Sequence, residues 1–139
     1  MVETSMSGQV NDDPRKLSAM IARAGDLAES HEVASVVVGL VAQAGDGRFP
    51  EYVDYLQGAL RVEDAIFRMT RERAVVHLAD CTEEQARKVL GRIAGEFQSE
   101  FPSLSALDFT ERYIEVKPGD EKPRVKDVLT RIFAPPVLH

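Results

Sequence analysis

The chain has 139 residues, of which 44% are hydrophobic and 29% are charged, and its formal net charge at pH 7 is −6. These values are typical of one soluble domain with a single core. The negative charge argues against general binding to nucleic acid or to an anionic membrane, because both need a basic surface. The longest apolar run, residues 36–42, is far short of the roughly 20 residues that span a bilayer. The N-terminus also lacks the apolar core of a signal peptide, so we expect a cytoplasmic protein.

Residues 1–12 are polar and show no periodicity, so we expect them to be disordered. Residues 13–30 form a predicted helix, with Asp13 as its N-cap and Pro14 in its first turn. The β-branched run at 33–41 has no polar interruption, which is typical of a central strand covered on both faces. A loop at 44–50 then leads to a second helix, whose apolar positions are Tyr52, Val53, Leu56 and Leu60.

Two short strands at 65–69 and 74–78 surround the polar tip 70–73 and predict a hairpin. Thr82 and Gln85 have the spacing of a capping box, so a third helix begins there. A strand at 107–116, a turn at 117–123 and a closing helix at 124–133 complete the chain before a tail at 135–139.

Without the first helix, the element order is β-α-β-β-α-β. This order predicts an α+β domain of the ferredoxin-like class over residues 31–134, with the N-terminal helix as an addition. The fold class alone assigns no function.

Conventional catalytic patterns are missing from the sequence. It has no nucleophile elbow, no phosphate-binding glycine loop and no pair of Cys or His residues at metal-ligand spacing. The lone Cys81 cannot form an intramolecular disulfide and has no partner pattern for a catalytic thiol. The three histidines are isolated, and His77, within a strand, can be either a structural residue or a ligand contact.

An ordered series of short motifs nevertheless resembles a known family. Gly45-Asp46 opens the helix that leads to Arg61-x-x-Asp64, and five residues later comes the hairpin tip, Thr70-Arg71-Glu72-Arg73-Ala74. In this order and spacing the chain resembles the GGDEF family of bacterial diguanylate cyclases, whose catalytic fold extends the same β-α-β-β-α-β plan. The resemblance covers about residues 33–133 and is strongest over 45–93.

The departures from the family pattern remove its catalytic residues. Thr70 and Arg71 replace the two signature glycines, and Arg73 reverses the charge of one signature acid, while Glu72 can stand for the other. The first strand contains no metal-binding aspartate, and the substrate-binding segment that follows it in the family is shortened. Because two-metal phosphoryl transfer needs converging carboxylates, the resemblance implies a chain that makes no cyclic di-GMP and needs no metal cofactor.

What the chain keeps is the pattern of the family's inhibitory, product-binding site. The resemblance implies that Arg61 grips guanine and phosphate, that Asp64 accepts hydrogen bonds from the guanine N1 and N2 edge, and that Arg92 completes the site. A guanidinium is a planar fork of donors, and a carboxylate only accepts, so the residue types fit these roles. The alternative is a plain ion pair between residues three apart at a helix end.

The sequence therefore leaves two main hypotheses. The first is a non-catalytic cyclic di-GMP receptor that binds through Arg61, Asp64 and Arg92 and signals through a homodimer or a protein partner. The second is a ligand-free interaction domain that keeps only the fold. An enzyme of another class is a weaker third, because no acid, base and nucleophile can be assembled from the sequence. Whether the N-terminal helix packs on the domain or mediates dimerisation is not decided by the sequence.

Overall fold

The computed structural model describes residues 12–103 and 107–133. The elements are α2 (Pro14–Ser30), β1 (Ser35–Ala42), α3 (Arg48–Ala59), β2 (Ala65–Arg68), β3 (Arg73–Leu78), α4 (Glu83–Glu100), β4 (Phe109–Val116) and α5 (Val125–Ile132). Their order is the predicted one, and each boundary lies within two or three residues of its expected place. The predicted disorder of residues 1–11 and the predicted tail at 135–139 lie outside the described residues.

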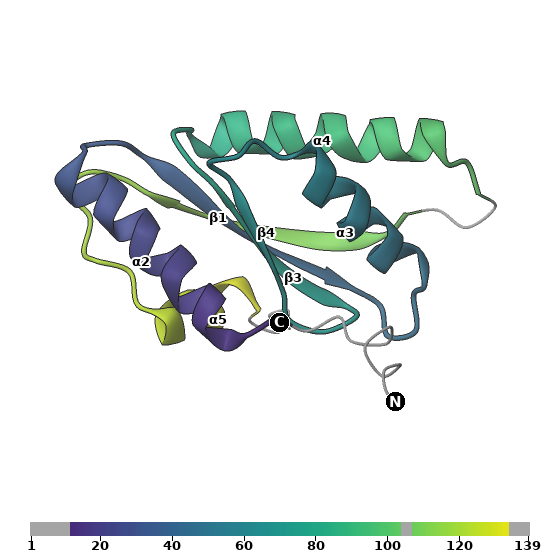
Figure 1. Cartoon of the computed structure of the whole chain (residues 1–139), viewed down its shortest axis with the longest axis horizontal. Helices are drawn as coiled ribbons and strands as arrows, with labels where there is room; N and C mark the ends of the chain where they lie inside the picture. The colour runs from purple at the N-terminus through teal and green to yellow at the C-terminus, as the bar shows by residue number, and fades with distance from the viewer. Residues whose placement is uncertain (1–11, 104–106, 134–139) are drawn as a thin grey trace, which may run out of the picture.

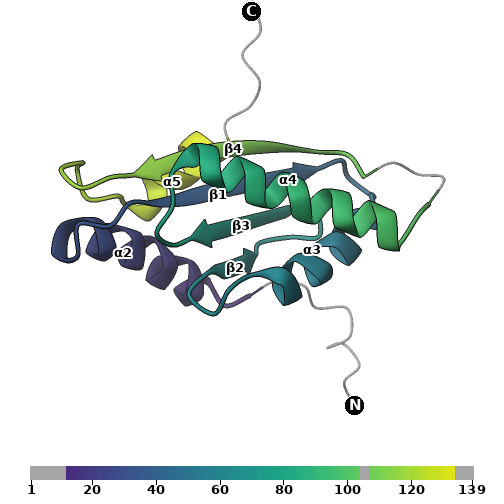
Figure 2. The same ribbon diagram turned by 90° about the horizontal axis from the view of Figure 1, so that it is seen from above.

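The four strands form one sheet in the order β2-β3-β1-β4, and every neighbouring pair is antiparallel. β1 lies in the middle, where Val37 is paired with His77 of β3 and with Ile114 of β4. Its residues from Ser35 to Leu40 are all buried, which confirms the prediction of a central strand covered on both faces. Figure 2 shows the sheet with α3 and α4 crossing in front of it.

Helices cover both faces of the sheet, so the molecule has three layers (Figure 1). Alternate β1 side chains point to opposite faces, as a strand requires. Val36, Val38 and Leu40 pack in a core with α3 and α4, and Val37 packs in a second core with α2 and α5. The N-terminal helix is thus part of this domain, because its apolar stripe covers the sheet.

The helix starts follow from local sequence. The Asp13 carboxylate accepts a hydrogen bond from the Arg15 amide and caps α2. Thr82 and Gln85 form the predicted capping box at the start of α4. Asp12, which the sequence places in a disordered segment, instead lies against the edge strand β2, where its amide donates to the Arg68 carbonyl at 2.8 Å. None of the helices in the described ranges is long and apolar enough to cross a membrane.

Candidate functional site

The Arg61-to-Asp64 segment lies just beyond a helix rather than in its last turn. α3 ends at Ala59 with Leu60 as its C-cap, and residues 61–64 form the turn that leads into β2. The Asp64 amide donates to the Arg61 carbonyl at 3.0 Å and closes this turn. The expectation that Arg61 lies in the end of a helix is therefore wrong. α3 ends two residues earlier, at Ala59, because the chain must reverse direction before β2.

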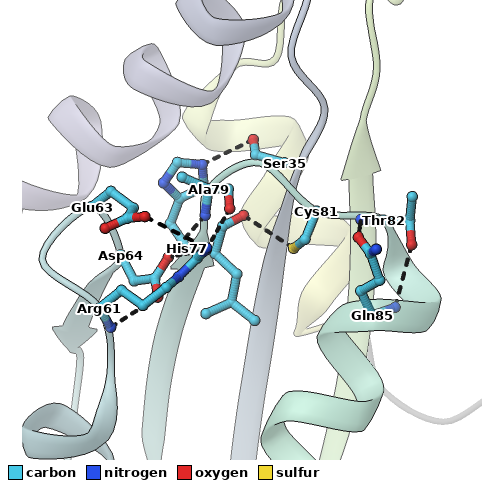
Figure 3. A network of polar contacts seen from close by, with 10 residues as sticks. Ser35, Arg61, Glu63, Asp64, His77, Ala79, Cys81, Thr82 and Gln85 are labelled. Atoms are coloured by element: carbon cyan, nitrogen blue, oxygen red, sulfur yellow. Dashed lines mark hydrogen bonds and ion pairs between the residues drawn. The ribbon is translucent and has the colours of Figure 1, made fainter.

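Asp64 is the centre of a dense polar network (Figure 3). Its Oδ2 accepts from the Arg61 amide at 3.1 Å and from Arg61 Nε at 3.0 Å. Its Oδ1 accepts from Arg61 Nη2 at 2.9 Å and from the Ala79 amide at 3.0 Å. A carboxylate offers about four lone-pair positions, so these four donors fill it. Its side chain is only 3% exposed, and this network holds the turn against the end of β3.

Arg61 is bound firmly to the network along one edge and only weakly along the other. Nε and Nη2 face Asp64, and Nη2 also donates to the Ala79 carbonyl. Nη1 has a weaker ion pair, at 3.5 Å from Glu63 Oε2. The hydrogen bonds that Arg61 donates to Asp64 raise the pKa of Arg61 above its ordinary value, so this half-exposed side chain is a permanent cation.

A surface hollow of about 340 Å³ lies between this turn and α4. That size is near the lower end of the roughly 300–1,000 Å³ of small-molecule sites. Its apolar lining comes from Ala59, Leu60, Leu78 and Val89, and its polar lining comes from Arg61, Asp64, Asp80, Cys81, Gln85 and Arg92. Arg61 and Asp64 of the turn and Arg92 of α4, the three residues predicted from the sequence, therefore line one hollow.

The three selected residues differ in how accessible they are. Arg92 is exposed, and no hydrogen bond or ion pair joins it to any other described residue. Arg61 is 50% exposed, but Asp64 is almost fully covered. Two cations are thus available to an anionic ligand, whereas the Asp64 carboxylate opens only if Arg61 moves away from it.

Two further polar residues of the hollow were not selected from the sequence. Asp80 follows β3, is exposed, and has a left-handed backbone with φ of 53°. Gln85 uses its Oε1 in the capping box of α4, so its amide N–H groups are left to other partners. No sequence signal marks either residue as a ligand contact, and the packing of α4 beside the turn brings both to the hollow.

Cys81 also lines the hollow. Its thiol contacts the Leu78 carbonyl at 3.5 Å. Burial raises the pKa of Cys81 to about 11, and the opposing effect of Arg61 is smaller. The thiol is therefore protonated at neutral pH and is a poor nucleophile.

His77 is a structural residue of the core under α2. It is fully buried, and its Nε2 lies 2.9 Å from Ser35 Oγ. Burial lowers the pKa of His77 to about 4, and the nearby charge of Arg23 adds to this effect. The ring is therefore neutral at physiological pH, and it does not line the hollow.

The hairpin tip between β2 and β3 shows how the chain folds without the signature glycines. Thr70 and Arg73 close the tip through backbone hydrogen bonds of 3.1 and 3.4 Å. Among the described residues, non-glycine backbone with positive φ is confined to Glu32 and Asp80, so this tip needs no glycine. The Arg73 guanidinium lies 5.2 Å from the centre of the Phe133 ring.

The two other arginines that lie near the site in sequence are engaged elsewhere. Arg68 pairs with Asp54 of α3 at 2.9 Å. Arg87 pairs with Glu83 at 2.8 Å and lies over the Tyr113 ring at 4.1 Å. Neither lines the hollow.

A second Arg-x-x-Asp segment, Arg124 to Asp127, provides an internal comparison. Arg124 Nε and Asp127 Oδ2 are 3.1 Å apart, with side chains 80% and 57% exposed. In this second pair the carboxylate receives no hydrogen bond from a distant strand among the described residues. The same sequence pattern thus gives a plain surface ion pair at α5 and a buried network beside the hollow.

Solved structures with the same fold include PelD and a GGDEF domain, and two of them are complexes with c-di-GMP. PelD from residue 158 to its C-terminus, from Pseudomonas aeruginosa PAO1, matches with a TM-score of 0.67 and 21% identity, over 89% of this chain and 46% of that one. PelD 156–455 from Pseudomonas aeruginosa PA14, in complex with c-di-GMP, matches with a TM-score of 0.65 and 21% identity, over 87% and 44%. The GGDEF domain of DgcB from Caulobacter crescentus, in complex with c-di-GMP, matches with a TM-score of 0.67 and 16% identity, over 90% and 86%.

This chain has a GGDEF-like fold. The fold prediction from the motif series is thus confirmed at the level of architecture. The chain spans less than half of the PelD chains that it matches, 46% and 44%. No protein-family model and no curated protein sequence matches it.

Proposed function

We propose that this protein is a non-catalytic, degenerate GGDEF-like domain of ferredoxin-like topology that binds cyclic di-GMP in the hollow beside Arg61. The observation that carries the proposal is the placement of Arg61, Asp64 and Arg92 around one hollow. Two of the solved structures with this fold are complexes with c-di-GMP, which supports the choice of ligand.

The two arginines supply the attraction for the ligand. Arg92 has no partner to lose among the described residues, so it can turn toward a phosphate or toward guanine O6 and N7. Arg61 offers Nη1, whose present partner Glu63 is 3.5 Å away and 42% exposed. Exchanging that solvated ion pair for a phosphate has a small cost, because such pairs contribute about 0–1 kcal/mol.

Asp64 contributes to the site by positioning Arg61. Its carboxylate fixes the guanidinium along one edge, so the other edge is held in place before a ligand arrives, and preorganisation of this kind favours binding. Direct acceptance from guanine N1 and N2 requires that Arg61 first leave both carboxylate oxygens, because all four acceptor positions are filled.

The proposal excludes diguanylate cyclase activity. In place of one signature acid the hairpin carries Arg73, and Arg71 replaces a signature glycine two residues before it. Cations at these positions repel Mg²⁺ and disfavour a pair of bound metal ions. The domain therefore binds the dinucleotide but does not synthesise it, and no cofactor is required.

A response to the ligand needs a second surface. Val62, within the turn, is 99% exposed, and it lines a neighbouring hollow together with Arg61. Arg61 and Arg92 would hold cyclic di-GMP at the molecular surface, beside the exposed Val62 side chain. We propose that the occupied site contacts a second copy of the chain or a protein partner there.

The alternative function is a ligand-free interaction domain. The complete internal satisfaction of Asp64 favours it, since the network explains the Arg-x-x-Asp pair as a brace for the turn. The two functions make opposite predictions for ligand binding.

Calorimetric titration with cyclic di-GMP distinguishes them. The receptor predicts micromolar or tighter binding to the wild type, and weakening of at least tenfold in Arg61→Ala and in Arg92→Ala. Arg124→Ala, from the second Arg-x-x-Asp, is the matched control and is expected to bind like the wild type. No heat with the wild type at high ligand concentration supports the interaction domain.

A further inference from the structure

A site that selects guanine needs a hydrogen-bond acceptor for the N1–H and N2–H donors of the base. Asp64 is unsuited to this role in the free protein, because its carboxylate already accepts four hydrogen bonds and is 3% exposed. Two of those donors are backbone amides, of Arg61 and Ala79, which a ligand cannot displace without opening the turn.

Asp80 is the other acidic residue that lines the hollow. It is exposed, and no hydrogen bond or ion pair joins its side chain to another described residue. It lies close enough to Cys81 for its charge to contribute to the raised pKa of that thiol. Asp80 is therefore an acceptor-only group at the hollow that has no competing donor within the described chain.

The backbone holds Asp80 on both sides. The Ala79 amide and carbonyl are bound to Asp64 and Arg61, and the Cys81 amide donates to the Ala34 carbonyl at 3.1 Å. Between these anchors Asp80 adopts φ of 53°, a region that Asp and Asn tolerate better than most residues. The carboxylate is thus carried by a fixed segment rather than by a free loop.

The groups around the hollow match the two polar edges of guanine. Arg61 and Arg92 are donors for O6, N7 or a phosphate, and Asp80 is the acceptor. Leu60, Leu78 and Val89 supply apolar surface for the faces of the base. Adenine has no N1–H and no amino group at C2, so an acceptor at this place discriminates against it.

We propose that Asp80 is the guanine-selecting residue of the site, accepting from N1–H and N2–H of one base. This inference rests on the proposed binding of cyclic di-GMP. It adds to the Arg61, Asp64 and Arg92 set a residue that lies outside the Arg-x-x-Asp motif, and it assigns Asp64 to the positioning of Arg61.

The test compares two cyclic dinucleotides that differ only in the amino group at C2 of each base, cyclic di-GMP and cyclic di-IMP. Their dissociation constants are measured by calorimetry for the wild type, Asp80→Gly, Asp80→Asn and Asp64→Asn. Glycine and asparagine both accept positive φ, so the two Asp80 variants preserve the backbone. A melting curve checks that each variant is folded.

The wild type is expected to prefer cyclic di-GMP by roughly tenfold, the factor that one hydrogen bond to a charged acceptor provides. In Asp80→Gly this preference falls below about twofold. Asp80→Asn keeps one acceptor oxygen and is expected to give an intermediate ratio. Asp64→Asn weakens the binding of both ligands and keeps the ratio.

Two results overturn the inference. An unchanged ratio in Asp80→Gly, with or without an equal loss of affinity for both ligands, or a ratio that collapses in Asp64→Asn, removes Asp80 from guanine selection. In both cases the wild type still binds cyclic di-GMP, and the proposed function stands. Absence of wild-type binding instead removes the proposed function itself.

Discussion

Replacement of Asp64 by alanine tests the network on which the candidate site is built. The substitution leaves the Ala79 amide without its acceptor at the end of β3, where Ala79 is only 3% exposed. A buried donor without a partner costs about 1–3 kcal/mol. The lost contact to the half-exposed Arg61 guanidinium adds about 1 kcal/mol or less. We expect Asp64→Ala to lower the free energy of unfolding by about 1–4 kcal/mol.

The assay is urea denaturation followed by circular dichroism, with a thermal melt as a second readout. For a domain of this size, the expected loss corresponds to a decrease in melting temperature of roughly 3–12 °C. Asp127→Ala is the matched control, because Asp127 forms an Arg-x-x-Asp pair that is open to solvent. It is expected to change stability by well under about 1 kcal/mol. Equal effects of the two substitutions would refute the network as a structural brace.

Three other predictions concern the core formed with α2 and α5 and the hairpin. His77 has a pKa of about 4 in the folded chain and about 6.5 when unfolded, so lowering the pH through this interval protonates only the unfolded state. The wild type should therefore lose up to about 3 kcal/mol of stability relative to His77→Leu between pH 7 and pH 4 in urea titrations, and parallel pH profiles would contradict this. Gly39→Ala places a Cβ 2.7 Å from the Ile132 Cβ, so it should destabilise the chain by about 1–3 kcal/mol, whereas Gly58→Ala, with open space around it, should be neutral or slightly stabilising. Incubation with GTP and Mg²⁺ should give no cyclic di-GMP by chromatography, and steady turnover would overturn the argument from the altered hairpin.

Much of the fold could be predicted from the sequence, because local rules and tertiary packing agree. The β-branched run of β1 specifies a strand that is buried on both faces, and it occupies the centre of the sheet. Asp13 and Thr82 cap α2 and α4 as their positions predict. The packing of α2 on the sheet could not be predicted, because an apolar stripe requires a covering surface without identifying it.

The candidate site was only partly predictable. The resemblance implied that Arg61, Asp64 and Arg92 share one site, and these three residues line one hollow. The burial of Asp64 could not be read from sequence, because it depends on an amide of Ala79, fifteen residues along the chain. Asp80 has no motif around it, and its only local signal is a backbone conformation that appears in the folded chain.

The central claim is that cyclic di-GMP occupies the hollow beside Arg61, and Cys81 reports on that place directly. Cys81 is the only cysteine of the chain and lines the hollow. The measurement is the rate of Cys81 alkylation by iodoacetamide at mildly alkaline pH, with and without the dinucleotide, followed by mass spectrometry. We predict that cyclic di-GMP at about ten times the wild-type dissociation constant slows the reaction at least several-fold in the wild type and less than about twofold in Arg61→Ala. Binding that is detected by calorimetry but leaves the wild-type alkylation rate unchanged would contradict the account.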